Sequence, residues 1–129
     1  MKTLVLGASL KTHRFSHKAV QKLVAYEHEV VAYGLKEGEI SGITIDTELE
    51  QYSDIHTITL YLNATRQSAF YDYIISLQPK RVIFNPGTEN PEFYQLLGNN
   101  NIDHEVACTL VLLASNQYEP KKSKEPVNG

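Results

Sequence analysis

Short runs of apolar or β-branched residues recur along this chain, and stretches with helical periodicity separate them. Runs of this kind are typical of strands that are buried on both faces of a sheet. Strands that alternate with helices form right-handed βαβ units, which give a parallel sheet covered by helices on both faces. The five predicted strands are Thr3–Leu6, Val30–Tyr33, Thr57–Leu62, Arg81–Phe84 and Glu105–Ala107.

The segments between these strands carry the signals of helices. Ser16 is a suitable N-cap for a first helix, in which one apolar stripe is formed by Ala19, Val20, Leu23 and Val24. The periodicity predicts further helices over 67–77 and 91–98, and at 109–114 a short helix is favoured over a continued strand. The alternation of Ile43-Thr44-Ile45 is typical of a short exposed extended piece.

The predicted fold is therefore a three-layer, Rossmann-like α/β fold with a five-stranded parallel sheet in the order 3-2-1-4-5. Because a chain of 129 residues is close to the commonest size of one domain, we expect a single domain over residues 1–118. The remaining segment, 119–129, has almost no apolar residues and is predicted to be a disordered polar tail.

Charge and apolar content argue against several classes of protein. A net charge of −3 disfavours a nucleic-acid-binding surface. No apolar run reaches the length of about 18 residues that spans a membrane, and Met1–Gly7 lacks the features of a signal peptide, so we expect a cytoplasmic protein. Cys108 is a single cysteine and no third ligand accompanies His13 and His17, so no metal is expected.

Small, amide, hydroxyl and basic residues follow the predicted strands at their carboxyl ends. Ligands of open parallel sheets bind outside this edge, so these residues are the candidates for a binding site. They are Gly7, Ala8, Ser9, Lys11, Arg14 and Ser16 after the first strand, Lys36 after the second, Asn63 after the third, and Asn85, Pro86 and Gly87 after the fourth.

Basic side chains concentrate at the start of the first helix, although the chain as a whole is acidic. Lys11, His13, Arg14, His17 and Lys18 lie around a helix N-terminus, where free backbone N–H groups and the helix dipole attract anions. Cations beside such a site favour a phosphorylated ligand. The alternative is a basic surface loop that binds nothing.

The glycine pattern disfavours NAD as that ligand. The dinucleotide fingerprint needs G-x-G-x-x-G after the first strand and an acidic residue after the second. Here the first segment reads Gly7-Ala8-Ser9-Leu10-Lys11-Thr12, so the second and third glycines are missing. Lys36 follows the second strand, with Glu37 behind it, and a lysine there favours an additional phosphate over a bare ribose.

Several of these segments resemble a known family, the small stand-alone CoA-binding domain proteins. The resemblance lies in Gly7-Ala8-Ser9 with the loop to Ser16, in Val30–Lys36 and in the segment around Gly42. That family shares the fold of the CoA-binding half-domain in the succinyl-CoA synthetase α subunit. Thr59–Asn63, Phe84–Glu92 and Ala107–Leu113 are similar to one branch of it, and the resemblance extends from Lys2 to about Tyr118.

One segment departs from the family pattern. Members usually continue their second strand into Asn-Pro-Lys, whereas this chain reads Gly34-Leu35-Lys36 and keeps only the lysine. The residues that would contact the adenine side of the ligand are therefore the ones that match the family pattern least.

The resemblance implies a module that binds coenzyme A or acyl-CoA at the carboxyl edge of the sheet. No nucleophile with its base is evident, so a binding protein without its own catalysis is favoured over an enzyme. Three alternatives stay open. They are a small enzyme acting on an acyl-CoA or other phosphorylated substrate through Asn85, Thr88 or Glu89, an NAD(P)-binding protein, and a subunit that acts by association. In the last case the tyrosine-rich helix over 67–77 is the candidate interface for a protein partner or homo-oligomer.

Overall fold

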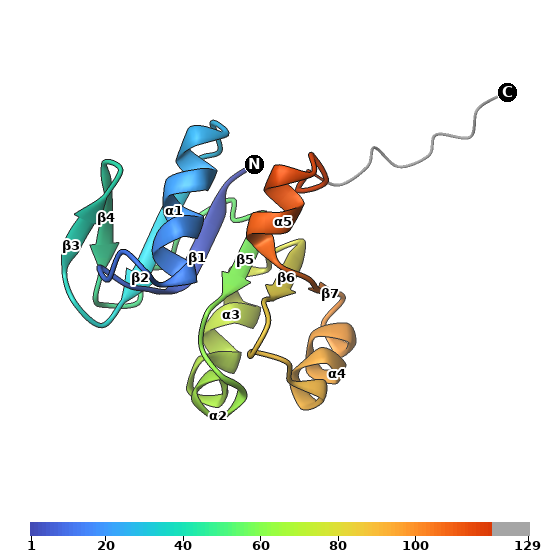
Figure 1. Ribbon diagram of the computed structural model, residues 1–129. Coiled ribbons are helices and arrows are strands. Elements are labelled where there is room, and N and C mark those ends of the chain that lie inside the picture. The colour runs from blue at the N-terminus through green and yellow to red at the C-terminus, as the bar shows by residue number, and fades with distance from the viewer. Residues whose placement is uncertain (120–129) are drawn as a thin grey trace, which may run out of the picture.

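The computed structural model describes residues 1–119, and within them the strands form one seven-stranded sheet (Figure 1). Its order is β3-β4-β2-β1-β5-β6-β7, and all neighbouring strands are parallel except β3 and β4. The strands are β1 (Thr3–Ala8), β2 (Val30–Gly34), β3 (Gly38–Ile40), β4 (Ile43–Asp46), β5 (Thr57–Leu60), β6 (Arg81–Phe84) and β7 (Asp103–Val106).

Helices cover both faces of the sheet, as Figure 1 shows. Helices α1 (Phe15–Ala25) and α5 (Thr109–Ala114) share one core with the sheet residues Val5, Ala32 and Ile83. On the other face, α3 (Tyr71–Leu77) and α4 (Pro91–Asn99) pack against a second set of sheet residues, Leu4, Leu6, Ile58, Leu60, Val82 and Phe84. The predicted three-layer, Rossmann-like α/β fold is confirmed.

The predicted number and order of strands are wrong. The predicted third strand, β5, pairs with β1 and β6 rather than lying outside β2. All four residues of β5 are fully buried, which requires a neighbouring strand on each side and a helical layer on each face. A position at the edge beyond β2 would have left one side of this strand open to water.

A β-hairpin occupies the edge beyond β2 instead. Strand β4 runs parallel to β2, with Ala32 opposite Ile45, and β3 pairs antiparallel with β4. The two are joined at Ser41 and Gly42, both with positive φ, which is the conformation of a two-residue hairpin turn. The segment predicted as an exposed extended piece is therefore a strand, and its Ile45 is buried.

Two helix starts also differ from the expectation. Helix α1 begins at Phe15 with Arg14 as N-cap, so Ser16 lies inside the first turn and does not cap it. The helix predicted over 67–77 begins earlier and is interrupted, as α2 (Ala64–Gln67), the 3₁₀ turn η1 (Ser68–Phe70) and α3. Asn63 caps α2 through its side chain. The predicted helix over 109–114 is confirmed as α5.

The amino edge of the sheet is closed by the buried side chains of Arg81 and Tyr118. Arg81 donates from Nε to the Thr57 hydroxyl at 2.9 Å, forms an ion pair with Glu105 at 3.1 Å, and donates to the Tyr118 carbonyl. The hydroxyls of Tyr118 and Thr3 are hydrogen-bonded at 2.7 Å. These contacts use the polar groups of Arg81, Tyr118, Thr57 and Thr3 within the fold.

No helix among residues 1–119 has the length and apolar content needed to cross a membrane. Of the segment predicted to be a disordered tail, 119–129, only Glu119 belongs to the described residues, and its side chain is exposed.

Candidate functional site

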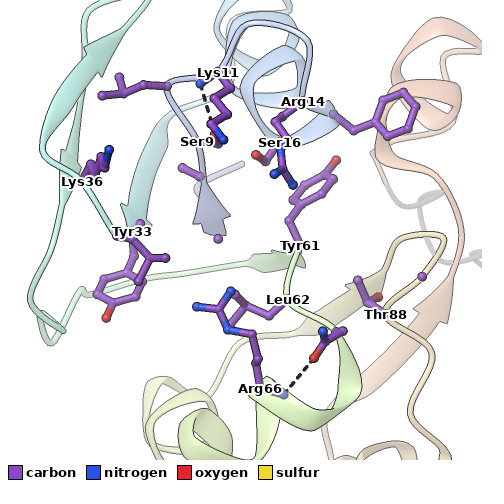
Figure 2. Close-up of a pocket in the computed structure, with 18 of the residues that line it drawn as sticks. Ser9, Lys11, Arg14, Ser16, Tyr33, Lys36, Tyr61, Leu62, Arg66 and Thr88 are labelled. Carbon is purple, nitrogen blue, oxygen red and sulfur yellow. Dashed lines mark hydrogen bonds between the residues drawn. The ribbon is translucent and has the colours of Figure 1, made fainter.

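The sheet order creates a crevice between β1 and β5 at the carboxyl edge. From β1 the chain passes through α1 to β2 on one side, whereas β5 lies on the other side of β1. Open α/β sheets bind ligands where the strand order reverses in this way. A cleft of about 770 Å³ opens here (Figure 2), which lies within the range of roughly 300–1,000 Å³ for small-molecule sites.

Of the predicted site residues, all except Asn85 line this cleft: Gly7, Ala8, Ser9, Lys11, Arg14, Ser16, Lys36, Asn63, Pro86 and Gly87. The cleft is also lined by residues that the sequence places at or just after the strand ends, namely Leu10, Gly34, Leu35, Arg66 and Thr88. The lining residues that were not among the predicted ones are apolar or aromatic: Phe15, Tyr33, Tyr61, Leu62 and Phe70. Tyr33 and Tyr61 lie at the carboxyl ends of β2 and β5, so position in the strand is the signal that could have identified them.

Two glycines form the floor of the cleft by allowing backbones to approach closely. Gly7 has φ +103°, and a Cβ there would lie 3.1 Å from the backbone of Tyr61. At Gly34 a Cβ would lie only 2.2 Å from the carbonyl oxygen of Ala8. The ends of β1, β2 and β5 can therefore meet only because these two positions carry no side chain.

Internal hydrogen bonds hold the loop between β1 and α1 in place. The Ser9 hydroxyl accepts from the Lys11 amide at 3.1 Å, and His17 donates from Nδ1 to the Ser9 carbonyl at 3.0 Å. The Arg14 amide donates to the Lys11 carbonyl at 3.0 Å. His17 is thus part of the support of the loop, and within residues 1–119 no group of His, Cys, Asp or Glu side chains could hold a metal ion.

The first turn of α1 faces this loop with unused donors. The first intrahelical bond runs from the Lys18 amide to the Arg14 carbonyl, so the N–H groups of Phe15, Ser16 and His17 precede the helical ladder. No side chain caps this end, and no acidic residue lies in the first turn. Arg14, Phe15 and Ser16 line the cleft, which places an anion-attracting helix N-terminus at its wall.

Four cations surround the cleft, and no carboxylate is among the described residues that line it. Lys11 and Arg14 come from the loop before α1, Lys36 follows β2, and Arg66 belongs to α2. Figure 2 shows the Arg66 side chain extending between Tyr33 and Leu62. None of the four forms an ion pair with another residue in the part of the chain that the structure describes. In a chain of net charge −3, this is a local concentration of positive charge.

Asn85 does not line the cleft, because its side chain is buried and used in internal hydrogen bonds. Its Nδ2 donates to the Thr59 hydroxyl at 2.7 Å and to the Leu60 carbonyl at 2.9 Å, while Oδ1 accepts from the Thr109 amide at 2.8 Å. Asn85 therefore fixes the start of α5 against β5. The turn that follows places Gly87 at φ +92° and is closed by the Thr88 amide on the Asn85 carbonyl at 2.9 Å.

Tyr61 lines the cleft with its ring, but its hydroxyl is buried without a hydrogen-bond partner among residues 1–119. Burial raises the pKa of Tyr61 to about 12, although the nearby hydroxyls of Thr109 and Thr59 act in the opposite direction. The phenol is therefore neutral over the ordinary pH range and does not serve as a base.

We expect Tyr61→Phe to raise the free energy of unfolding by about 1 kcal/mol, because it removes a buried polar atom whose desolvation is not repaid. The matched control is Tyr118→Phe, which removes a made hydrogen bond to Thr3 and should lower the same quantity by about 1 kcal/mol. Urea unfolding of the two variants measures both effects. A loss of stability in Tyr61→Phe equal to that in Tyr118→Phe would contradict the assignment.

Comparison with known proteins agrees with this architecture. A crystal structure of an uncharacterized protein is 45% identical, with a TM-score of 0.87 over 90% of this chain and 96% of that one. Two further structures share the fold at low identity. A protein from Thermus thermophilus is 19% identical, with a TM-score of 0.79 over 90% of this chain and 89% of its own. A hypothetical protein from Pyrococcus horikoshii is 17% identical, with a TM-score of 0.79 over 91% and 83%.

No protein of curated function matches the sequence closely. The family model described as CoA binding domain matches residues 1–114, which is most of the 129-residue chain. The match covers all the strands and helices described here, including every residue that lines the cleft. The predicted resemblance is confirmed, and the chain belongs to the CoA binding domain family.

Proposed function

We propose that the cleft between β1 and β5 binds coenzyme A or an acyl-CoA. The observation that carries the proposal is a cleft that combines the uncapped N-terminus of α1 with four cations that form no ion pair with any of residues 1–119. CoA carries a diphosphate and a ribose 3′-phosphate. The diphosphate fits the loop from Ser9 to Ser16 and the first turn of α1, where backbone N–H groups and Arg14 can donate to it. Lys36, on the β2 side, is the cation that we assign to the 3′-phosphate.

The same arrangement supports a binding module over an enzyme. The three residues considered for catalysis are engaged in the turn after β6. Asn85 has all its polar atoms occupied, the Thr88 hydroxyl donates to the Asn85 carbonyl at 2.7 Å, and Glu89 accepts from the Gly87 amide at 3.0 Å. A side chain that is hydrogen-bonded within its own loop is poorly placed to transfer a proton to or from a substrate.

The tyrosines considered for a protein interface also have internal contacts. Tyr71 stacks on Phe93, with ring centroids 4.2 Å apart, and the Tyr73 hydroxyl donates to the Glu50 carbonyl at 2.6 Å. These contacts give both residues a role in packing α3 against its neighbours. They offer no support for association through this helix.

Ligand-dependent stability tests the proposal. At a concentration of about 100 times its Kd, CoA should stabilise the fold by roughly 2.7 kcal/mol. For a domain of this size that corresponds to a rise in melting temperature on the order of ten degrees. Dephospho-CoA should give a smaller rise at the same concentration, and NAD the smallest. If CoA leaves the melting temperature unchanged and titration calorimetry detects no heat of binding, the proposal is wrong.

A further inference from the structure

Gln67 joins the two loops that form the wall of the cleft opposite α1. Gln67 is the last residue of α2, and its side chain is fully buried. Its Nε2 donates to the Leu62 carbonyl at 2.8 Å and to the Thr88 carbonyl at 2.7 Å. Leu62 belongs to the loop after β5 and Thr88 to the loop after β6, and both residues line the cleft. One amide nitrogen therefore holds two cleft loops together.

A second amide fixes the orientation of the first. The Gln67 Oε1 accepts from Asn90 Nδ2 at 2.9 Å, and the same Nδ2 donates to the Tyr71 hydroxyl at 2.8 Å. Asn90 Oδ1 accepts from the Phe93 amide at 3.3 Å and so caps α4. With its oxygen committed to Asn90, Gln67 must present both N–H groups to the two carbonyls.

Few hydrogen bonds join the loop after β5 to the loop after β6 in the part of the chain that the structure describes. Among residues 1–119, every hydrogen bond between the segments 61–67 and 86–90 runs through Gln67. The hydrogen bonds from Asn85 run to Thr59 and Leu60 of β5, so they join the ends of the strands rather than the two loops. Loss of the Gln67 amide would leave the Leu62 and Thr88 carbonyls free to separate, while the sheet below them stays paired.

We propose that Gln67 is a positioning residue that sets the width of the cleft for its ligand. This inference rests on the proposed function, since it assigns Gln67 a part in CoA binding without contact to CoA. It acts through the Leu62 and Thr88 carbonyls, which hold Asn63, Pro86 and Gly87 at the mouth of the cleft. In the sequence, Gln67 stands as the first residue of the helix predicted over 67–77.

The test compares Gln67→Met with Tyr71→Phe. Methionine keeps the length of the side chain but removes both donors, whereas phenylalanine removes the outer bond of the same network and leaves the two loops joined. Both variants should melt below the wild type. Only Gln67→Met should weaken CoA binding, by about tenfold in Kd. This is the change in Kd that corresponds to the free energy of about one hydrogen bond. Should Gln67→Met fail to fold, Gln67→Asn keeps an amide that is too short to reach both carbonyls.

Amide hydrogen exchange without ligand separates this inference from the proposed function. Exchange in residues 62–66 and 86–89 should rise in Gln67→Met relative to Tyr71→Phe, whether or not CoA binds. If the wild type binds no CoA, the proposed function fails, and with it the role in ligand binding. If the wild type binds CoA and both variants bind it equally well, Gln67 is a stabilising residue only and the inference is overturned. Equal exchange in the two variants also overturns it.

Discussion

Replacing Gly34 with alanine should destabilise the fold by about 3 kcal/mol or more, the largest effect we expect from any single methyl group in this chain. The added Cβ would lie 2.2 Å from the carbonyl oxygen of Ala8, and this oxygen belongs to the backbone of the central strand β1. A flexible side chain could rotate away from such a contact. The backbone of Ala8, which is paired with Gly34, can move away only if the ends of β1 and β2 separate at the cleft.

Gly98 provides the control for this substitution. It lies in helix α4, it is exposed, and no atom lies within 4 Å of the position that a Cβ would take. Gly98→Ala should therefore stabilise the protein by about 0.5–1 kcal/mol, because alanine is the better helix former. Urea unfolding measures both variants. A Gly34→Ala protein as stable as the wild type would mean that the ends of β1 and β2 lie further apart than described.

Charge reversal at Lys36 should remove most of the preference for CoA over dephospho-CoA. A charge-assisted contact to a phosphate contributes roughly 1.5–3 kcal/mol, so the preference in the wild type should be about ten- to a hundred-fold. Lys36 is exposed and forms no ion pair with residues 1–119, so Lys36→Glu should leave the ligand-free melting temperature nearly unchanged. Titration calorimetry of the two proteins with both ligands measures the loss.

Lys80→Glu is the control for the change in net charge. Lys80 is exposed and precedes β6 at the amino edge of the sheet, away from the cleft. The Lys80→Glu substitution should leave the affinities for both ligands within about twofold of the wild type, because salt screens the interaction between exposed charges more than about 10 Å apart. If the wild type binds CoA and dephospho-CoA with equal affinity, the assignment of the 3′-phosphate to Lys36 is wrong.

The layers of the fold could be predicted because each β-strand and each helix carries its own signal. Leu4–Leu6 and Val30–Tyr33 are uninterrupted apolar runs, and the apolar residues of the helix over 91–98 have helical spacing. The position of β5 could not be predicted from such signals, because a βαβ pattern leaves open the side of β1 on which a later strand lies. The complete burial of Thr57–Leu60 decides it, and burial is a property of the assembled sheet.

The hairpin was missed for a different reason. Its turn is Ser41-Gly42, and serine is not a residue that favours positive φ, so the segment lacks the Asn-Gly or Asp-Gly signal of such turns. With Ile43–Asp46 taken out of the sheet, the edge beyond β2 was left without a strand. The predicted order puts the third strand, Thr57–Leu62, at that edge instead.

The residues of the candidate site also fall into two groups, those that the position of a strand predicts and those whose role depends on distant contacts. Gly7 lies at the end of β1, and Ser9 and Arg14 follow in the loop before α1, so the position of the strand alone placed all three at the carboxyl edge. Asn85 also follows its strand directly, but its role depends on Thr59 and Thr109, which lie 26 and 24 residues away. Local sequence cannot tell an amide that faces a ligand from one that fills its bonds with distant partners.

Four like charges line one cleft in this protein, and no carboxylate among residues 1–119 lines it with them. Lys11, Arg14, Lys36 and Arg66 repel one another across a cavity of about 770 Å³, and the macrodipole of α1 adds to the repulsion. Any polyanion that enters relieves this repulsion before it makes one specific contact. For the phosphorylated ligand that we propose, part of the affinity should therefore be general and fall as ionic strength rises. Inorganic phosphate in a buffer competes for the same relief, so the choice of counter-ion sets the apparent selectivity of the site.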